Sequence, residues 1–253
     1  MFVSKTLDVD SLNEAFEKQK PAEIIKWAVC EFRPKLAMTS SFGPESGVLL
    51  HLVSQMDPSV PVLFLETGYH FPETLEYRNE LVKRFGFKNV IDLHADPRRR
   101  QEIVEKYAGK PYEKDPDRCC QVNKVEPLDE ALKAYAAWMS GIRRQQTDQR
   151  KTIRVLELYE NGQYKVSPLA NWTSRETWWY LKEHKIPQHP LYEKGYLSIG
   201  CWPCTRPIQA GDDERSGRWA GRAKKECGIH LFQEVKQTED KDKGAPPDIS
   251  SNI

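Results

Sequence analysis

Short apolar runs alternate, along the first half of the chain, with segments whose apolar residues recur at helical spacing. The runs cover residues 36–39, 60–65, 89–93 and 135–139, and each has the length of a buried strand. Between them the pattern favours amphipathic helix, for example around residues 48–53. Strands that alternate with helices in this way predict an α/β fold, with a doubly wound, mostly parallel sheet covered by helices on both faces.

Two helices are expected before the first strand. Ser11-Leu12-Asn13-Glu14 has the spacing of a capping box, which predicts a helix start at Ser11. A second helix is predicted to begin at Pro21, because proline is favoured at the first helical position. Cys30 falls within that helix, and we expect it to be a small core residue.

The second half of the chain is expected to be less regular. Asn161-Gly162 predicts a hairpin turn, and Thr173 precedes a helix in which we expect Trp178 and Trp179 to serve packing. The polar residues 233–253 predict a disordered tail, so residues 1–232 are expected to form a single domain.

Composition excludes several classes of protein. No run approaches the roughly 18–20 apolar residues of a membrane span, and the first residues lack the apolar stretch of a secretory signal. The net charge of +1 does not indicate binding to a polyanion. We therefore expect a cytoplasmic protein without membrane or nucleic-acid partners, whose six cysteines serve metal binding or catalysis rather than disulfides.

Loops at the predicted strand ends are the first candidates for ligand binding, since ligands of such sheets bind beyond the carboxyl ends of strands. Ser40-Ser41-Phe42-Gly43 precedes Pro44 at a helix start, where amides and hydroxyls can hold phosphate or sulfate. The Gly-Lys-Ser/Thr ending of a Walker loop is absent. After another strand, Gly141 precedes Arg143 and Arg150, whose guanidiniums suit phosphate, although a solvated loop is the alternative.

Four cysteines form a candidate metal site. Cys119-Cys120 and Cys201-x-x-Cys204 supply a complete ligand set for zinc or for an iron–sulfur cluster. Adjacent side chains diverge on a helix, whereas one zinc needs all four sulfurs about 2.3 Å away, which modestly favours a 4Fe–4S cluster over zinc. Lys124 follows closely enough to offset the negative charge of such a site.

Cys227 is not needed for that ligand set. It follows Lys224 and Lys225, and cationic neighbours lower the pKa of a thiol, so Cys227 is the candidate nucleophile. His230, three residues later, is expected to serve packing or positioning.

Taken in order, these residues resemble the assimilatory adenylyl-sulfate (APS) reductases, within the larger APS/PAPS reductase family. The resemblance covers about residues 20 to 232, with Glu66 in place of an expected Asp and Thr147 in place of the commoner Ser. It rests on the segments Ser40-Ser41-Phe42-Gly43, Glu66–Thr74, Cys119-Cys120 with Lys124–Leu128, Gly141–Gln146, Lys165–Leu169, Cys201-x-x-Cys204 and Glu226–His230.

The resemblance implies an adenine nucleotide α-hydrolase-like fold, with a C-terminal segment, residues 205–232, that carries the catalytic Cys227. It implies a 4Fe–4S cluster on Cys119, Cys120, Cys201 and Cys204, which organises the site electrostatically. The substrate-binding residues expected on this basis are Ser41, Gly43, Leu65, Thr67, Lys124, Gly141, Arg143, Arg150, Arg215 and Arg218.

The implied activity is thioredoxin-dependent reduction of adenosine 5'-phosphosulfate (APS) to sulfite and AMP through a Cys227 thiosulfonate, in sulfate assimilation and cysteine biosynthesis. A homo-oligomer is possible. One alternative is a reductase of the 3'-phosphorylated nucleotide, PAPS, or of both nucleotides. An ATP-pyrophosphatase-type enzyme is a second alternative, but its Ser-Gly-Gly-x-Asp-Ser loop is absent. A non-catalytic cluster protein is a third, and it would leave Cys227 without a role.

Overall fold

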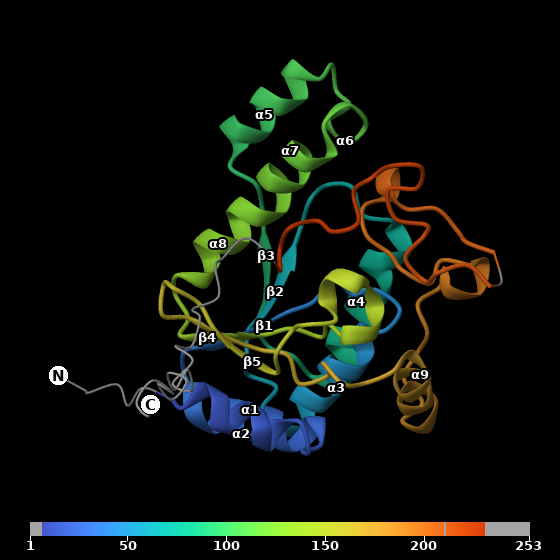
Figure 1. The fold of residues 1–253 in the computed structure, drawn as a ribbon. Helices are drawn as coiled ribbons and strands as arrows, with labels where there is room; N and C mark the ends of the chain where they lie inside the picture. Colours follow the sequence, from blue (N-terminus) through green and yellow to red (C-terminus); the bar gives the residue numbers. More distant parts are fainter. Residues whose placement is uncertain (1–6, 210, 231–253) are drawn as a thin grey trace, which may run out of the picture.

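The centre of the molecule is a six-stranded sheet with the strand order β3-β2-β1-β4-β6-β5 (Figure 1). The computed structural model describes residues 7–209 and 211–230, so the tail expected at 233–253 lies outside the described residues. All neighbouring strands are parallel except β5 and β6. The strands are β1 (Leu36–Thr39), β2 (Val62–Leu65), β3 (Val90–Leu93), β4 (Ala137–Met139), β5 (Leu156–Leu158) and β6 (Tyr164–Val166).

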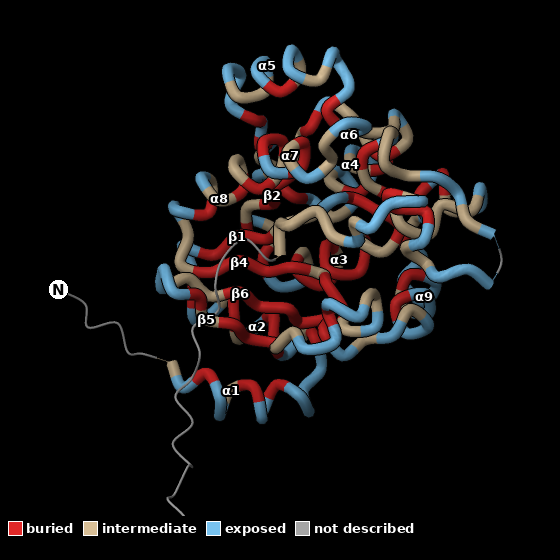
Figure 2. The backbone as a smooth tube through the Cα atoms, turned by 45° about the horizontal axis from the view of Figure 1, so that its top comes forward, coloured by how far each residue is buried: buried red, intermediate tan, exposed pale blue. Residues whose placement is uncertain are grey.

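Helices cover both faces of this sheet, which confirms the predicted doubly wound α/β class. Met38 and Phe64 belong to the main core, on the face packed by α2 (Pro21–Phe32), α3 (Ser46–Met56) and α4 (Pro72–Phe85). On the opposite face, Trp138 of β4 joins a smaller core with α8 (Glu126–Leu132). Figure 2 shows β1, β2 and β4 as largely buried, because both of their faces are covered, whereas β3 at the edge of the sheet buries only Leu93.

Further helices flank the sheet. In Figure 1 an arm of three short helices stands above the sheet and leads back to it through a π-helical turn, Gln121–Val125, before α8. The arm consists of α5 (Pro97–Lys106), α6 (Pro111–Lys114) and α7 (Pro116–Cys120). The other helices are α1 (Val9–Phe16) and α9 (Ser174–Glu183), with 3-10 turns at Arg144–Gln146, Asp148–Arg150, Tyr192–Lys194 and Trp202–Cys204.

Three local predictions are wrong. Helix α1 begins at Val9, because the Asp8 carboxylate accepts the Ser11 backbone N–H at 3.1 Å and caps the helix three residues earlier than predicted. Cys30 is exposed, since it falls on the face of α2 opposite the buried positions. Trp178 and Trp179 are 36% and 50% exposed.

Helix α9 shows why these tryptophans stay outside. It buries Thr177 and Leu181, four residues apart, and Tyr180 packs partly against the core, so Trp178 and Trp179 lie on the side that faces away from it. The helix expected after Thr173, by contrast, is confirmed, as is the antiparallel hairpin around Asn161-Gly162.

Within the described residues, no helix has both the length and the apolar character needed to cross a membrane.

Candidate active site

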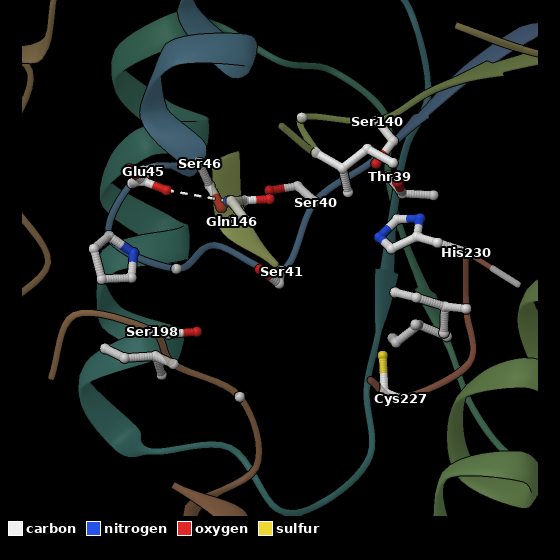
Figure 3. A pocket seen from close by; sticks show the side chains of 18 of the residues that line it. Thr39, Ser40, Ser41, Glu45, Ser46, Ser140, Gln146, Ser198, Cys227 and His230 are labelled. Carbon is white, nitrogen blue, oxygen red and sulfur yellow. Dashed lines mark hydrogen bonds between the residues drawn. The ribbon is translucent and has the colours of Figure 1, made fainter. Parts of the chain in front are cut away.

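A cleft of about 210 Å³ opens at the carboxyl ends of β1, β2 and β4. The chain runs from β1 outward to β3 and then returns to β4 on the other side of β1, so the cleft lies where the strand order reverses. Of the residues predicted from the sequence, those lining it are Ser41, Gly43, Leu65, Lys124, Gly141, Cys201, Arg150, Arg215, Arg218, Cys227 and His230. Figure 3 shows the Cys227 sulfur pointing into this cavity, on the same side as His230.

The loop between β1 and α3 forms the wall that was predicted to hold an anion. Phe42 has a φ of 49°, a left-handed conformation that costs a residue with a side chain roughly 1–2 kcal/mol. Its fully buried ring packs against Phe64 with ring centroids 5.5 Å apart, and its N–H donates to Ser40 Oγ at 3.1 Å. Packing therefore fixes the loop in its shape before any ligand binds.

The four cysteines of the predicted metal site line one small cavity beside the cleft. Cys201 and Lys124 line both cavities, so they stand between the cysteines and the cleft. Thr67 lies behind this wall: its Oγ1 is 3.4 Å from Cys201 Sγ, and it is not among the residues that line the cleft. Asn123 Nδ2 lies 3.7 Å from Cys119 Sγ, as a donor to the sulfur.

Three of these thiols, Cys119, Cys120 and Cys204, are held in an environment that disfavours their ionisation. At Cys201 the effect of burial is outweighed by neighbouring groups, Lys124 first, which lower the pKa. Burial raises the pKa of Cys119 to about 12 and that of Cys120 to about 11, and the neighbouring thiols add to the shift at Cys119. Burial alone would lower the pKa of Lys124, but the surrounding thiols, Cys201 first, raise it above the ordinary value. Four thiols, three of them buried, around one cavity that Lys124 also lines suit a bound cationic centre, because metal binding is what deprotonates such groups.

The predicted arginines divide into two groups. Arg143 is buried and does not line the cleft; its guanidinium donates to the Glu45 carboxylate and, at 3.2 Å, to Ser174 Oγ. Arg150 and Arg215 line the cleft and are both bound to Glu226.

Arg218 also lines the cleft, and its guanidinium lies 4.5 Å from the centroid of the Trp219 ring. Among the residues that the structure describes it forms no ion pair, although it is only 8% exposed. A buried guanidinium without a carboxylate is suited to an anionic ligand.

The cations beside Cys227 are not those expected from the sequence. Lys224, which was expected to activate the thiol, forms an ion pair with Asp117 instead. Lys124 and Arg215 are the cations whose pKa values the Cys227 thiol influences. Burial, more than any other cause, lowers the pKa of Arg215 to about 10, so it still carries its charge at neutral pH. Positive charge therefore reaches the thiol from Lys124 and from Arg215, which lies earlier in the same C-terminal segment, rather than from the adjacent Lys224.

His230 anchors the end of this segment. Its ring is stacked on Trp138, with centroids 6.0 Å apart and the planes 9° from parallel. Burial lowers its pKa well below the ordinary value, so the imidazole is neutral at pH 7. Its Nδ1 is buried and has no hydrogen-bond partner in the described part of the chain. A neutral, stacked imidazole in the cleft wall fits the positioning role expected for it.

Several cleft residues escaped the sequence analysis. Glu45 and Gln146 approach each other across the cleft wall, as the dashed line in Figure 3 shows, with Nε2 and Oε2 3.3 Å apart. Residues 197–200 form another part of the wall. No local pattern marks either feature; only the nearness of residues 197–200 to Cys201 could have drawn attention to that segment.

The fold and the cleft define the class of protein: an α/β protein with an adenine nucleotide α-hydrolase-like fold, in which a serine-rich loop and a cysteine line a cleft at the reversal point of the sheet. Residues 35–207 match the model of the phosphoadenosine phosphosulfate reductase domain. The chain therefore belongs to the APS/PAPS reductase family.

Individual relatives agree with this assignment. A protein of Chelativorans sp. (strain BNC1) named adenosine 5'-phosphosulfate reductase is 43% identical over 82% of this chain and 84% of its own length. A protein of the same name from Mesorhizobium japonicum is 42% identical over 87% of this chain and 86% of its own length.

Solved structures support the fold. The crystal structure of phosphoadenylyl-sulfate (PAPS) reductase from Candida auris, a phosphate complex, is similar with a TM-score of 0.66 and 28% identity, over 80% of this chain and 98% of that one. FMN adenylyltransferase from Candida glabrata, with a TM-score of 0.54 and 15% identity over 82% of this chain and 70% of its own, shares the fold alone.

Proposed function

We propose that the protein is an APS reductase that releases sulfite and AMP, with thioredoxin or a similar dithiol protein as its reductant. The observation that carries the proposal is the Cys227 thiol, which faces a switch-point nucleotide cleft beside Lys124 and Arg215. The names of the relatives that match over most of this chain also favour APS as the substrate.

The proposed reaction has two steps. The Cys227 thiolate attacks the sulfur of the phosphosulfate anhydride, so that a sulfur–sulfur bond forms, the sulfur–oxygen bond to the phosphate breaks, and AMP leaves with the electron pair. A phosphate with a second pKa of about 6 is a good leaving group without a strong acid. A carrier thiolate then attacks Cys227 Sγ and expels sulfite, and the second carrier thiol releases Cys227 as the carrier becomes a disulfide. The dithiol supplies both electrons.

The cations of the cleft make the first step possible. Thiolate and sulfate repel each other, and the positive charges of Lys124, Arg215 and Arg218 offset that repulsion where the new bond forms. The loop containing Ser41 and Gly43 would hold the nucleotide phosphate, since it precedes a helix N-terminus.

A 4Fe–4S cluster on Cys119, Cys120, Cys201 and Cys204 is the cofactor we propose. The donor set fits it: four thiols, three of them buried, line one cavity, with Lys124 beside them. In a 4Fe–4S cluster each iron takes one thiolate, so the four cysteines supply a complete ligand set. When bound, the cluster supplies electrostatic organisation of the site.

The cellular setting follows from this reaction and stays a prediction. Sulfite production of this kind belongs to sulfate assimilation and cysteine biosynthesis, in the cytoplasm, where protein thiols stay reduced. Assembly into a homo-oligomer also stays a prediction.

The substrate is tested by purifying the protein anaerobically and measuring sulfite with either APS or PAPS in the presence of thioredoxin. We expect a larger kcat/KM with APS. A preference for PAPS would place the protein with the PAPS reductases, and no sulfite from either nucleotide would refute the proposed reaction.

The position of Arg218 gives a further prediction, because Gly200 makes room for its guanidinium. A Cβ added at Gly200 would lie 2.3 Å from Arg218 Nη2 and 2.6 Å from Cζ, so Gly200→Ala must displace Arg218. Losing one charge-assisted contact to substrate should lower kcat/KM about 10- to 100-fold with little change in Tm.

The matched control is a double variant. If Gly200→Ala acts only through Arg218, adding it to Arg218→Ala should cause no further loss of kcat/KM. If the two losses of kcat/KM add, Gly200→Ala affects the reaction by a route other than displacement of Arg218.

A further inference from the structure

A buried carboxylate lies next to the nucleophile in sequence. Glu226 immediately precedes Cys227, and its side chain is 8% exposed. Arg150 donates to it through both Nε, at 2.8 Å from Oε1, and Nη2, at 2.7 Å from Oε2. Thr147 Oγ1 donates to Oε1 at 3.2 Å and Arg215 Nη2 to Oε2 at 3.3 Å, so each carboxylate oxygen has two donors.

These contacts join three segments of the chain. Thr147 and Arg150 belong to the loop that follows β4, whereas Arg215 follows the Cys201–Cys204 turn. Glu226 lies on the segment that carries the thiol. The Glu226 carboxylate therefore connects the residues next to Cys227 to the loop after β4 and to Arg215.

The two arginines are held from outside the cleft. Arg150 and Arg215 line the cleft but Glu226 does not, so the carboxylate contacts the guanidiniums without occupying the ligand space. Arg150 Nη1 donates to Gln146 Oε1 at 2.5 Å, and Arg215 Nη1 lies 3.4 Å from Ser198 Oγ. The positions of two cleft cations and of the thiol thus depend on the same group.

The carboxylate is charged in this setting. Burial alone would raise the pKa of Glu226, but hydrogen bonds and charge from Arg150, with charge from Arg215, lower it overall. Removing one partner of a buried, hydrogen-bonded ion pair is costly, because the other partner is left without compensation.

We propose that Glu226 is a positioning residue, whose clamp by Arg150, Thr147 and Arg215 holds the Cys227 thiol in the cleft. The proposal rests on the proposed function in so far as Cys227 is the nucleophile. Without the carboxylate, the residues next to Cys227 lose their charged attachment to the loop that follows β4, while the Lys224–Asp117 ion pair still connects the segment to α7. Arg150 and Arg215 can still bind a nucleotide. Its negative charge then compensates the two guanidiniums in place of the Glu226 carboxylate.

The test compares Glu226→Gln with the wild-type holoenzyme, with Asp212→Asn as the control from the same part of the chain. Alkylation of Cys227 by a neutral maleimide is followed by peptide mass spectrometry over a range of pH, with the exposed Cys30 as an internal reference. At high pH the alkylation rate reaches a plateau, because all of the Cys227 is then thiolate. The plateau rate therefore reports how accessible the thiolate is and does not depend on its pKa. AMP binding and the kcat and KM for APS are measured on the same samples.

For Glu226→Gln we expect the plateau alkylation rate to rise about tenfold and kcat to fall about 10- to 100-fold, while the Kd for AMP stays within about threefold. Glu226→Asp should recover part of kcat, and Thr147→Val, which removes one neutral donor, should have a smaller effect than Glu226→Gln. Asp212→Asn should match the wild type in every measurement.

An unchanged plateau rate would overturn the proposal. So would AMP binding that tightens more than about tenfold without a change in alkylation, since Glu226 would then act as a competitor of the substrate anion. Alkylation and AMP binding need no turnover. A wild-type protein inactive on both nucleotides would therefore count against the proposed reaction, while the alkylation rate would still decide the role of Glu226.

Discussion

Replacing Cys227 with serine is expected to lower sulfite formation by about 10⁴-fold or more, because a serine hydroxyl cannot replace the thiolate nucleophile. AMP binding should stay within about threefold of the wild type, since the substitution is nearly isosteric and leaves Arg150, Arg215 and Arg218 in place. Sulfite is measured anaerobically with APS and thioredoxin, and AMP binding by calorimetry.

Cys30→Ser is the matched control, because it makes the same chemical change at an exposed position on α2, outside the residues that line the cleft. It should retain full activity. Sulfite production that survives in Cys227→Ser would show that another group is the nucleophile.

Replacing Cys201 with serine should have the second largest effect. Cys201 lines both the cysteine cavity and the cleft, so its loss removes one proposed iron ligand and disturbs the wall beside Lys124. Replacing a residue that only hydrogen-bonds to a metal ligand typically lowers metal affinity or activity 10–100-fold. Loss of the ligand itself should therefore reduce activity more than about 100-fold. Iron content and visible absorption of the anaerobically purified protein should fall in parallel with activity.

The same Cys30→Ser protein is the control for this experiment, and it should keep the iron content of the wild type. Iron retained in Cys201→Ser would show that Cys201 is not a ligand. If the wild-type protein is colourless and contains zinc, the four cysteines bind zinc and not a 4Fe–4S cluster.

Much of the fold was predictable because it depends on local patterns. The apolar runs at residues 36–39 and 135–139 became β1 and β4, and their spacing by helices fixed the parallel sheet. Parallel strands bring their following loops to one edge, which is why Ser41 and Gly141 could be placed at the same cleft from sequence alone.

The contacts made by charged side chains were not predictable in this way. Arg150 and Glu226 are far apart in the sequence, and nothing near either residue indicates the other. For the same reason, the sequence showed a basic segment at Lys224 but not its pairing with Asp117. It showed four arginines as candidates for substrate binding, but not that Arg143 is bound to Glu45 and does not itself line the cleft.

Exposure of individual residues depended on helix phase. Cys30 and Trp179 were both assigned to packing by residue type, yet both lie on outward faces of their helices. An apolar residue type predicts burial only when it coincides with the buried face, and that face is defined by the neighbouring elements.

The central claim is that Cys227 receives the sulfonate group from the nucleotide, and the most direct measurement uses no reductant. The anaerobic protein is incubated with APS alone, and then AMP release and the mass of the Cys227 peptide are determined. The account predicts one AMP released for each protein chain and one SO₃ group added to Cys227, which is removed as sulfite when thioredoxin is supplied. AMP release without that adduct, or an adduct on a different residue, would contradict it.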